Sequence, residues 1–498
     1  MVFLLLLFFV PGMAWGNQLF LKLGLDPSDL TSACLLFFQG YIAVELLRQM
    51  ASQLNSFAQS RIQPAVLVLL SFLGLVLLGS LALKMPRSTH EPLSWTDTIF
   101  TATSAVCVTG LTVVDTGTAF TETGRWILLG LIQIGGLGIM TLTACVVMFF
   151  GGSMGFRERV TVQDLVQADI FERVHVILIR ILGITLSIEA LAAAILWWQW
   201  RELIPDPAMR TEQAIFHAVS AFCNAGFSSL AGGLSTQGFA TFLPGLWTLS
   251  LVVILGGLGI PVLVDVLHLP GRRRVRGWQM QTKVVLYSNL LLLSLGTLVI
   301  WLSEREGVLA SLSAGDQLGQ AFFLATMPRT AGFQTMDLVQ LAPLSMGLIL
   351  VWMVIGGAPG STAGGLKVTT VWTVLAYFKS LVRGEPSVSL FGREVSESLC
   401  ARAMALCLLY GMMAFACGLI LISVEGLEPL TAFFEVISAL STVGLSLGGS
   451  TECGDLGRWV LIVCMFLGRI GIITFLWSLF YRERQTLTRY PQENILLY

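Results

Sequence analysis

The stretch IFTATSAVCVTGL at residues 99–111 recurs three times along this chain of 498 residues. The other copies are IFHAVSAFCNAGF (215–227), FFLATMPRTAGF (322–333) and FFEVISALSTVGL (433–445). Each copy has a serine or threonine six residues before a glycine, and a large apolar residue after it. The glycines are Gly110, Gly226, Gly332 and Gly444. Four copies at near-equal spacing predict an internal fourfold repeat.

A second marker follows each glycine in phase with the first. Its copies are IGGLGI (134–139), LGGLGI (255–260), IGGAPG (355–360) and LGRIGI (467–472). Long apolar segments flank each glycine copy, and we expect them to be helices. The expected helices are 64–83, 174–198, 283–302 and 399–424 before the copies, and 125–150, 245–267, 345–376 and 457–480 after them. Each repeat therefore predicts a helix, a short helix that cannot span a membrane, an extended loop and a second helix.

Composition places these helices in a membrane. Apolar residues make up 55% of the chain and charged residues only 12%, whereas a soluble protein has about 25% charged residues. Apolar runs of about 20 residues are long enough to cross a bilayer as helices. The net charge of −1 means that no bulk basic field attracts the phosphates of a nucleic acid. The predicted fold is an all-α integral membrane protein with four tandem helix–pore helix–filter loop–helix repeats, arranged with pseudo-fourfold symmetry around a central pore.

The expected organisation has six parts and a defined orientation. The parts are an N-terminal accessory region (1–60), repeat 1 (61–152), repeat 2 (153–270), repeat 3 (271–385), repeat 4 (386–480) and a C-terminal tail (481–498). Arginine and lysine concentrate at the junctions between repeats and in the tail, which predicts that these face the cytoplasm. The run at 1–10 is either a signal-like segment or part of a membrane helix.

The glycine loops carry the expected chemistry. Irregular backbone at membrane depth is tolerated where it lines a water-filled cavity, and backbone carbonyls in such a pore replace the water around a cation. Glycine adopts the unusual backbone angles that this requires. The C-terminal ends of four short helices would add partial negative charge that favours a monovalent cation. The candidate filter residues are Val108, Thr109, Gly110, Asn224, Ala225, Gly226, Thr330, Ala331, Gly332, Thr442, Val443 and Gly444.

Repeat 3 and repeat 4 each carry an anomaly in their second helix. The stretch GGAPGSTAGG at 356–365 has too many helix breakers for an ordinary helix. It is either a movable plug beneath the filter or a simple hairpin or kink. Arg469 either faces the pore and holds this stretch or extends to the cytoplasmic surface. The candidate gating residues are Gly356, Gly357, Gly360, Ser361, Thr362, Gly364, Gly365, Lys367 and Arg469.

No enzyme chemistry is expected. The nine cysteines include no CxxC pair, and the four histidines show no metal-ligand spacing. We therefore expect no catalytic and no cofactor-binding residues. Asp115 and Asp337, each five residues after a glycine, either form a cation-concentrating mouth or cap turns.

Together these strings resemble the Trk/Ktr/HKT superfamily of potassium transporters, with the greatest similarity to the Ktr-type membrane subunit. The supporting strings are VTGLTVVDTG (108–117), CNAGF (223–227), RTAGFQTMDL (329–338), STVGLS (441–446), GGAPGSTAGGLK (356–367) and GRIG (468–471). The resemblance implies that the four glycines belong to a potassium filter. It further implies that the glycine-rich break is an intramembrane gating loop and that Arg469 is its constriction partner.

The resemblance also implies partners and coupling. It implies a homodimer in the bacterial inner membrane, crossing the lipid bilayer several times, docked on a cytosolic nucleotide-binding regulatory ring of the RCK/KTN type. Potassium is the expected cargo, with sodium as a coupling or activating ion. The long N-terminal region resembles the Trk branch, which keeps a proton-coupled potassium symporter open. Another cation secondary transporter is the second alternative, although four copies in the same direction favour a pore.

Overall fold

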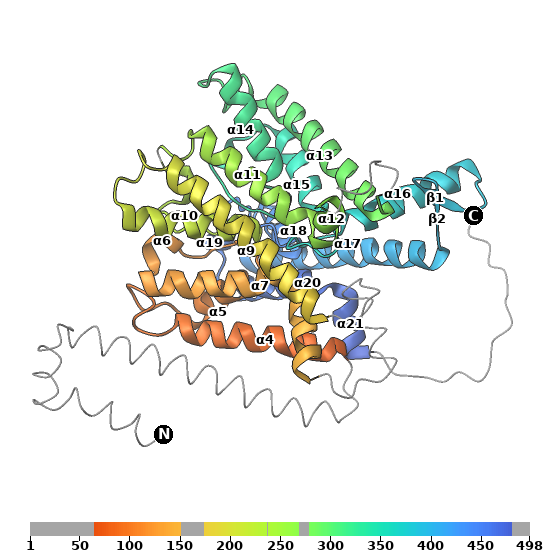
Figure 1. Cartoon of the computed structure of the whole chain (residues 1–498), viewed down its shortest axis with the longest axis horizontal. Helices are drawn as coiled ribbons and strands as arrows, with labels where there is room; N and C mark the ends of the chain where they lie inside the picture. The colour runs from red at the N-terminus through yellow and green to blue at the C-terminus, as the bar shows by residue number, and fades with distance from the viewer. Residues whose placement is uncertain (1–63, 151–173, 237, 268–277, 481–498) are drawn as a thin grey trace, which may run out of the picture. The chain divides into compact units, whose positions relative to one another are not determined.

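The computed structural model describes residues 64–150, 174–236, 238–267 and 278–480, and helices dominate this part of the chain (Figure 1). The chain divides between Gln63 and Pro64, and all described residues belong to the second unit. The expected accessory region 1–60 and the tail 481–498 lie outside the described residues. The expected repeat boundaries stay predictions.

The helices within the first half of the described chain follow in a regular order. In repeat 1 they are α4 (Pro64–Leu83), α5 (Trp95–Val106), α6 (Thr116–Ala119) and α7 (Glu122–Phe150). In repeat 2 they are α9 (Val174–Gln199), α10 (Pro207–Phe222), the 3₁₀ turn η3 (Gly233–Ser235), α11 (Leu243–Leu258) and α12 (Ile260–Leu267). A glycine-containing loop follows the short helices α5 and α10.

The second half contains the same kinds of element and one small sheet. Repeat 3 contains α13 (Met280–Glu304), α14 (Ala314–Thr326), η6 (Leu338–Gln340), α15 (Pro343–Val354) and α16 (Val368–Arg383). Repeat 4 contains the strands β1 (Val388–Leu390) and β2 (Arg393–Val395), then α17 (Glu397–Glu425), α18 (Pro429–Leu440), α19 (Gly449–Glu452), α20 (Asp455–Ile470) and α21 (Ile472–Phe480). The strands form an antiparallel hairpin at the far end of α16 and α17 (Figure 1).

Some of the described helices are long and apolar, and others are short. Among the described residues, Arg180–Gln199, Met280–Glu304 and Glu397–Glu425 are long and apolar enough to cross a membrane. Helices α11 and α12 qualify only as a pair. Many leucines on the long helices are exposed, such as Leu290 at 68% and Leu408 at 64%. Such outward apolar surface is typical of helices that face lipid.

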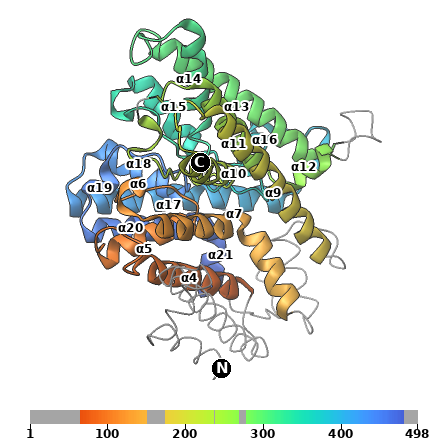
Figure 2. The same ribbon diagram turned by 60° about the vertical axis from the view of Figure 1, so that its left-hand side comes forward.

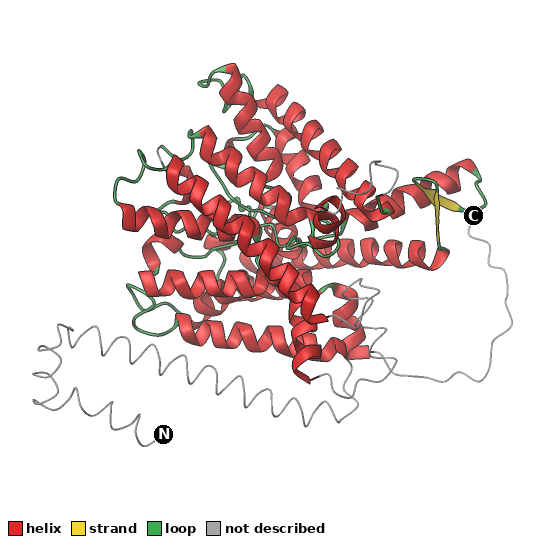
Figure 3. Ribbon diagram, in the orientation of Figure 1, coloured by secondary structure: helices red, strands yellow, loops and turns green. Residues whose placement is uncertain are grey.

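The short helices begin and end at recognisable signals. Ser94 and Ser313 accept hydrogen bonds from backbone N–H groups three residues later, and Asp206 caps α10 in the same way. Proline occupies the first turn of α10 and α18, where its missing N–H costs nothing. These caps fix where each short helix begins, and each ends at the loop that carries its glycine. The loops run through the interior of the helical body (Figure 3).

Two of the expected second helices are broken. Residues 245–267 form α11 and α12, which meet at an angle of 98°, and residues 457–480 form α20 and α21. The breaks occur at Gly259 (φ +81°) and Gly471 (φ +92°). The glycine-rich stretch between α15 and α16 interrupts a third helix, as expected. Only α7 continues unbroken through its marker.

Candidate functional site

The four glycine loops share an unusual backbone. Two residues before each glycine, the chain adopts a positive φ: 56° at Val108, 58° at Asn224, 64° at Thr330 and 50° at Thr442. The glycines themselves have φ values of 69° to 96°. Three of the four preceding residues are β-branched, and such residues strongly avoid this region. Backbone strain of this kind clusters at functional sites.

The four loops contact one another in a closed order. A β-carbon placed on Gly110 would lie within 3.0 Å of the carbonyl oxygen of Ala225 in the next loop. In the same way, Gly226 faces Ala331, Gly332 faces Val443, and Gly444 faces Thr109. The sequence of contacts therefore returns to its start. No side chain fits at any of the four positions, which is why each is glycine.

The four loops in this closed order are called the ring. In the described structure the backbone carbonyls of their candidate filter residues accept no hydrogen bond, whereas N–H groups of the same loops donate hydrogen bonds. Among the described residues, no N–H or O–H group donates to the carbonyl oxygen of any of the twelve candidate filter residues. Eleven of the twelve are buried, and Gly226 is partly exposed. Buried carbonyls are normally paired. Twelve unpaired ones at one place form a site that can coordinate a cation.

The hydroxyls before the glycines hold the loops in three repeats, and in repeat 2 the Ser220 hydroxyl does so by donating to the carbonyl of Phe227 at 2.7 Å. Ser104 and Ser438 each accept a hydrogen bond of 3.1 Å from the N–H of their own repeat's glycine. Repeat 3 differs, because the N–H groups of Ala331 and Gly332 both donate to the carbonyl of Met327. Thr326 instead donates to Phe322 in its own helix. The hydroxyl of Thr326 therefore does not hold its loop in the way that the hydroxyls of Ser104 and Ser438 do.

The glycine-rich stretch lies against the ring. A β-carbon on Gly364 would overlap with Thr442. The Thr362 hydroxyl donates to the carbonyl of Phe222 at 3.1 Å, at the C-terminal end of α10. The N–H of Ala358 donates to Gly257, and Gly360 accepts from Ile260, at the break between α11 and α12. The loop thus contacts elements of repeats 2 and 4.

Arg469 lies inside the molecule. Its side chain is 8% exposed and donates to the carbonyls of Thr362, in the loop, and Gly135, in α7. Of the two positions that the sequence left open, the structure has the inward one. Lys367 donates to Ala363 at 2.6 Å. Both cations line a cavity of about 300 Å³ beside the loop.

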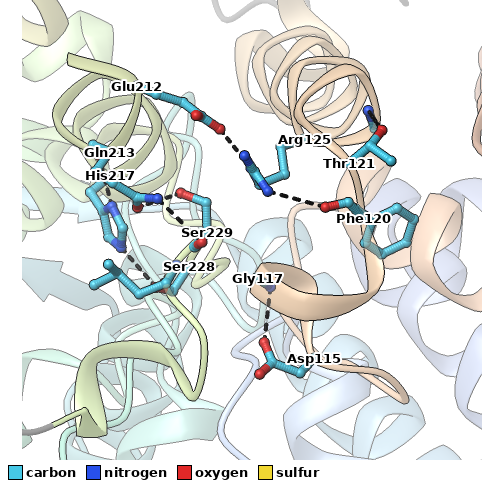
Figure 4. Close-up of polar contacts among 12 residues, drawn as sticks. Asp115, Gly117, Phe120, Thr121, Arg125, Glu212, Gln213, His217, Ser228 and Ser229 are labelled. Carbon is cyan, nitrogen blue, oxygen red and sulfur yellow. Dashed lines mark hydrogen bonds and ion pairs between the residues drawn. The ribbon is translucent and has the colours of Figure 1, made fainter. Parts of the chain in front are cut away.

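Asp115 and Asp337 cap turns. Asp115 accepts from the N–H of Gly117 at the start of α6 (Figure 4), and its other oxygen accepts from Gly232 of repeat 2. Asp337 accepts from the N–H of Val339 at the start of η6. Of the two alternatives, the turn cap is the one that the contacts support.

Three buried polar residues near the ring were not identified from the sequence. Arg329 donates to Asn289 in α13 and to the carbonyl of Gly356. His217 contacts Ser228 (Figure 4), and Glu435 accepts from the segment after Gly444. All three lie in or beside the repeated stretches, but their residue types differ from copy to copy. A search for shared residues therefore could not find them.

Comparison with known proteins gives consistent results. The sequence model of the TrkH family, described as cation transport protein, matches residues 38–480. The chain is 36% identical to Ktr system potassium uptake protein B of Bacillus subtilis, over 87% of this chain and 97% of that protein. It is 32% identical to potassium/sodium uptake protein NtpJ of Enterococcus hirae, over 88% and 97%. The crystal structure of the potassium transporter TrkH from Vibrio parahaemolyticus has the same fold, with a TM-score of 0.67 and 23% identity, over 84% and 86%.

These matches confirm the resemblance and the all-α membrane class that the sequence predicted. They also confirm a multi-pass protein of the plasma membrane. The chain therefore belongs to the TrkH family of cation transport proteins, which are transporters and not enzymes.

Proposed function

We propose that this chain is the ion-conducting membrane subunit of a potassium uptake system, with four repeats around a central, potassium-selective pore. The observation that carries the proposal is the closed ring of four loops, whose twelve carbonyls accept no hydrogen bond among the described residues. The names of the relatives from Bacillus subtilis and Enterococcus hirae, which specify potassium uptake, agree with it.

The chemistry of the ring suits a monovalent cation. Carbonyl dipoles can replace the hydration shell of potassium. The short helices α5, α10, α14 and α18 end directly before the four loops, so their C-termini add partial negative charge there. Divalent sites in proteins use several carboxylates. Within the part of the chain that the structure describes, no cluster of three or more His, Cys, Asp or Glu residues could hold a metal ion.

The loop at 356–367 and Arg469 form the proposed gate. The loop contacts the end of α10 and the ring residue Thr442, so an ion leaving the ring meets it next. Arg469 binds the loop to α7. Displacement of the loop, with release of this arginine, would open the path.

Coupling and partners complete the proposal. We expect a sodium-dependent subunit that forms a homodimer and binds a cytosolic nucleotide-binding regulatory ring. The name potassium/sodium uptake protein, given to the relative from Enterococcus hirae, supports a role for sodium. The alternative is a proton-coupled potassium symporter, or another cation secondary transporter, built on the same fold.

Rubidium uptake tests the two mechanisms. The full-length chain, reconstituted in potassium-loaded liposomes, should take up rubidium without a proton gradient, and sodium should increase the rate. Rubidium entry that requires a pH gradient and carries protons in fixed ratio would favour the symporter. If neither rubidium nor potassium is transported under either condition, and no added cation restores transport, the proposed function is contradicted.

A further inference from the structure

Two buried side chains hold the segments that follow the second and fourth glycines. His217 in α10 has its Nε2 2.8 Å from the hydroxyl of Ser228, two residues after Gly226. Glu435 in α18 accepts from the hydroxyl of Ser446, two residues after Gly444, at 2.5 Å. Neither His217 nor Glu435 is exposed to solvent. The two contacts are thus equivalent in position, although the residue types differ.

Glu435 makes the larger set of contacts. Its Oε1 also accepts from the N–H groups of Leu447 at 3.0 Å and Gly449 at 3.1 Å. Three donors from one segment therefore converge on a single carboxylate oxygen. The second oxygen is buried and has no partner among the described residues. A carboxylate held in this way fixes the path of the chain from residue 446 to residue 449.

The same helix position does not perform this role in the other two repeats. Each short helix has a buried phenylalanine, Phe100, Phe216, Phe323 or Phe434. The residues that follow them are Thr101, His217, Leu324 and Glu435. The Thr101 hydroxyl donates to Asp97 within its own helix, and a leucine cannot hydrogen-bond. A side chain that holds the segment after the glycine therefore occurs in repeats 2 and 4, which alternate with repeats 1 and 3 around the ring.

The segments of repeats 1 and 3 are attached to the segment that Glu435 fixes. Gln334, two residues after Gly332, donates to the carbonyl of Ser446 at 2.9 Å. Ser450 donates to the carbonyl of Thr112, two residues after Gly110, at 3.2 Å. Residues 446–450 thus connect three of the four loops. On the remaining side, Asp115 accepts from Gly232 of repeat 2.

We propose that Glu435 and His217 are positioning residues that set the ion selectivity of the ring, with Glu435 dominant. They touch no candidate filter carbonyl, and they act by fixing the segments after Gly226 and Gly444. The inference rests on the proposed function, because selectivity has meaning only if the ring conducts ions. Potassium and sodium differ in the ring diameter they need, so a loosened ring accepts sodium more easily.

Two variants of Glu435 separate the effect of its hydrogen bonds from the effect of its charge. Glu435→Ala removes the acceptor of three donors, whereas Glu435→Gln keeps an oxygen for them and removes the charge. Glu304→Ala is the matched control, because Glu304 is also a buried glutamate that accepts a backbone N–H, from Ala342, but lies outside the ring. Rubidium and sodium uptake are measured in bacteria that lack their own potassium uptake and express each full-length variant.

The expected result is a change in the ratio of rubidium uptake to sodium uptake. Glu435→Ala should lower the rubidium-to-sodium uptake ratio roughly fivefold, the factor that corresponds to one net hydrogen bond. Glu435→Gln should stay close to the unmodified chain, and Glu304→Ala should not change the ratio. His217→Leu, which introduces the residue type of repeat 3, should lower the ratio by less. If Glu435→Ala does not reach the membrane, Ser446→Ala takes its place, with a change in the same direction.

Three results would overturn the inference. One is an unchanged rubidium-to-sodium uptake ratio in Glu435→Ala, or in Ser446→Ala if Glu435→Ala does not reach the membrane. Another is a loss in Glu435→Gln as large as in Glu435→Ala, which would assign the effect to charge. The third is an equal loss in Glu304→Ala. Gly332→Ser in the same assay separates this inference from the proposed function: if it alone changes the ratio, only the positioning role fails, and if no variant changes it, the filter assignment fails.

Discussion

Backbone strain at single residues is concentrated in the ring, because four of the five non-glycine residues with positive φ in the described part of the chain lie there. Val108, Thr330 and Thr442 are β-branched residues with positive φ, a conformation that costs about 1–3 kcal/mol at each position. Such angles persist only where surrounding contacts impose them. Here those contacts include the N–H bonds from the loop back into the short helix, such as Thr109 to Ser104 at 2.8 Å. The backbone is therefore held in a conformation that it would not adopt alone.

Gly332→Ser should damage the ring. A side chain at φ +73° costs about 1–2 kcal/mol in backbone strain alone, and its β-carbon would overlap with Val443. We expect rubidium uptake at low potassium to fall at least about tenfold, with loss of growth rescue in a strain deficient in potassium uptake. Gly347→Ser is the control, because no atom lies within 4 Å of its β position. Normal uptake and selectivity in Gly332→Ser would contradict the filter assignment.

Arg469→Ala should increase the maximal rate. The substitution removes the hydrogen bonds to Thr362 and Gly135, so the loop loses its connection to α7. We expect rubidium uptake at saturating concentration to rise roughly tenfold, the factor for one charged hydrogen bond. The half-saturating concentration should not change, because the ring stays intact. Arg402→Ala, at an exposed position of α17, should behave as the unmodified chain; an unchanged rate in Arg469→Ala would reduce Arg469 to a structural contact.

The sequence reveals some of these residues and hides others for a physical reason. The glycines are visible because a steric requirement allows only one residue type at all four places. Glu435 and His217 are not visible, because a hydrogen-bond acceptor can be supplied by different residue types and two copies dispense with it. The inward position of Arg469 could be stated only as one of two alternatives, since a long side chain can reach either environment.

At the scale of elements, similar glycine-rich markers lie in a continuous helix in one repeat and at a helix break in another. Their composition alone does not predict which of the two forms. The marker IGGLGI in α7 is continuous helix, whereas LGGLGI breaks between α11 and α12 at Gly259. The difference lies in a tertiary contact, because the N–H of Ile260 donates to Gly360 in the neighbouring repeat. The hairpin of β1 and β2 was also not predicted. Its two-residue turn, Phe391 and Gly392, has φ of 49° and 75°, and Phe-Gly is not one of the residue pairs, such as Asn-Gly, that indicate such a turn in a sequence.

Shortening the loop between α15 and α16 should raise flux. Deletion of residues 359–363 removes Thr362, and with it the contacts to Phe222 and Arg469. We expect faster rubidium uptake with unchanged selectivity over sodium, because the ring is not altered. Thr362→Val, which removes only the hydroxyl, should give a smaller increase. A deletion variant that is well expressed and conducts at the normal rate would show that the loop is not a gate.

At the scale of the whole described unit, ion pairs connect only some neighbours. Arg125 at the start of α7 pairs with Glu212 of α10 at 2.5 Å, as Figure 4 shows. Arg458 at the start of α20 pairs with Asp97 of α5 at 2.6 Å. The contacts thus join repeat 1 to repeat 2 and repeat 4 to repeat 1, which lie side by side in Figure 2. Among the described residues, no ion pair joins repeat 3 to a neighbour.

This asymmetry places the proposed gate in the repeat that, among the described residues, no ion pair joins to a neighbour. Apart from the hydrogen bond that Arg469 of repeat 4 donates to Thr362, repeat 3, which carries the loop at 356–367, meets its neighbours through neutral contacts such as the stacked rings of Trp247 and Phe322. Neutral and apolar contacts permit small displacements at lower cost than a buried charged hydrogen bond does. Repeats 4, 1 and 2 would then serve as a fixed body against which repeat 3 and its loop can move.

Arg458→Ala tests this division of the molecule. The pair with Asp97 is largely shielded, with side chains 20% and 16% exposed, so its loss should cost about 1.5–3 kcal/mol and lower the midpoint of thermal unfolding by about 2–4 °C. Selectivity should not change, because the substitution lies outside the ring. Arg305→Ala breaks an exposed pair, with side chains 48% and 84% exposed, and should leave the midpoint unchanged, since such pairs contribute little. Equal midpoints for the two variants would mean that the bridges do not bind the fixed body together, and the asymmetry would then have no mechanical meaning.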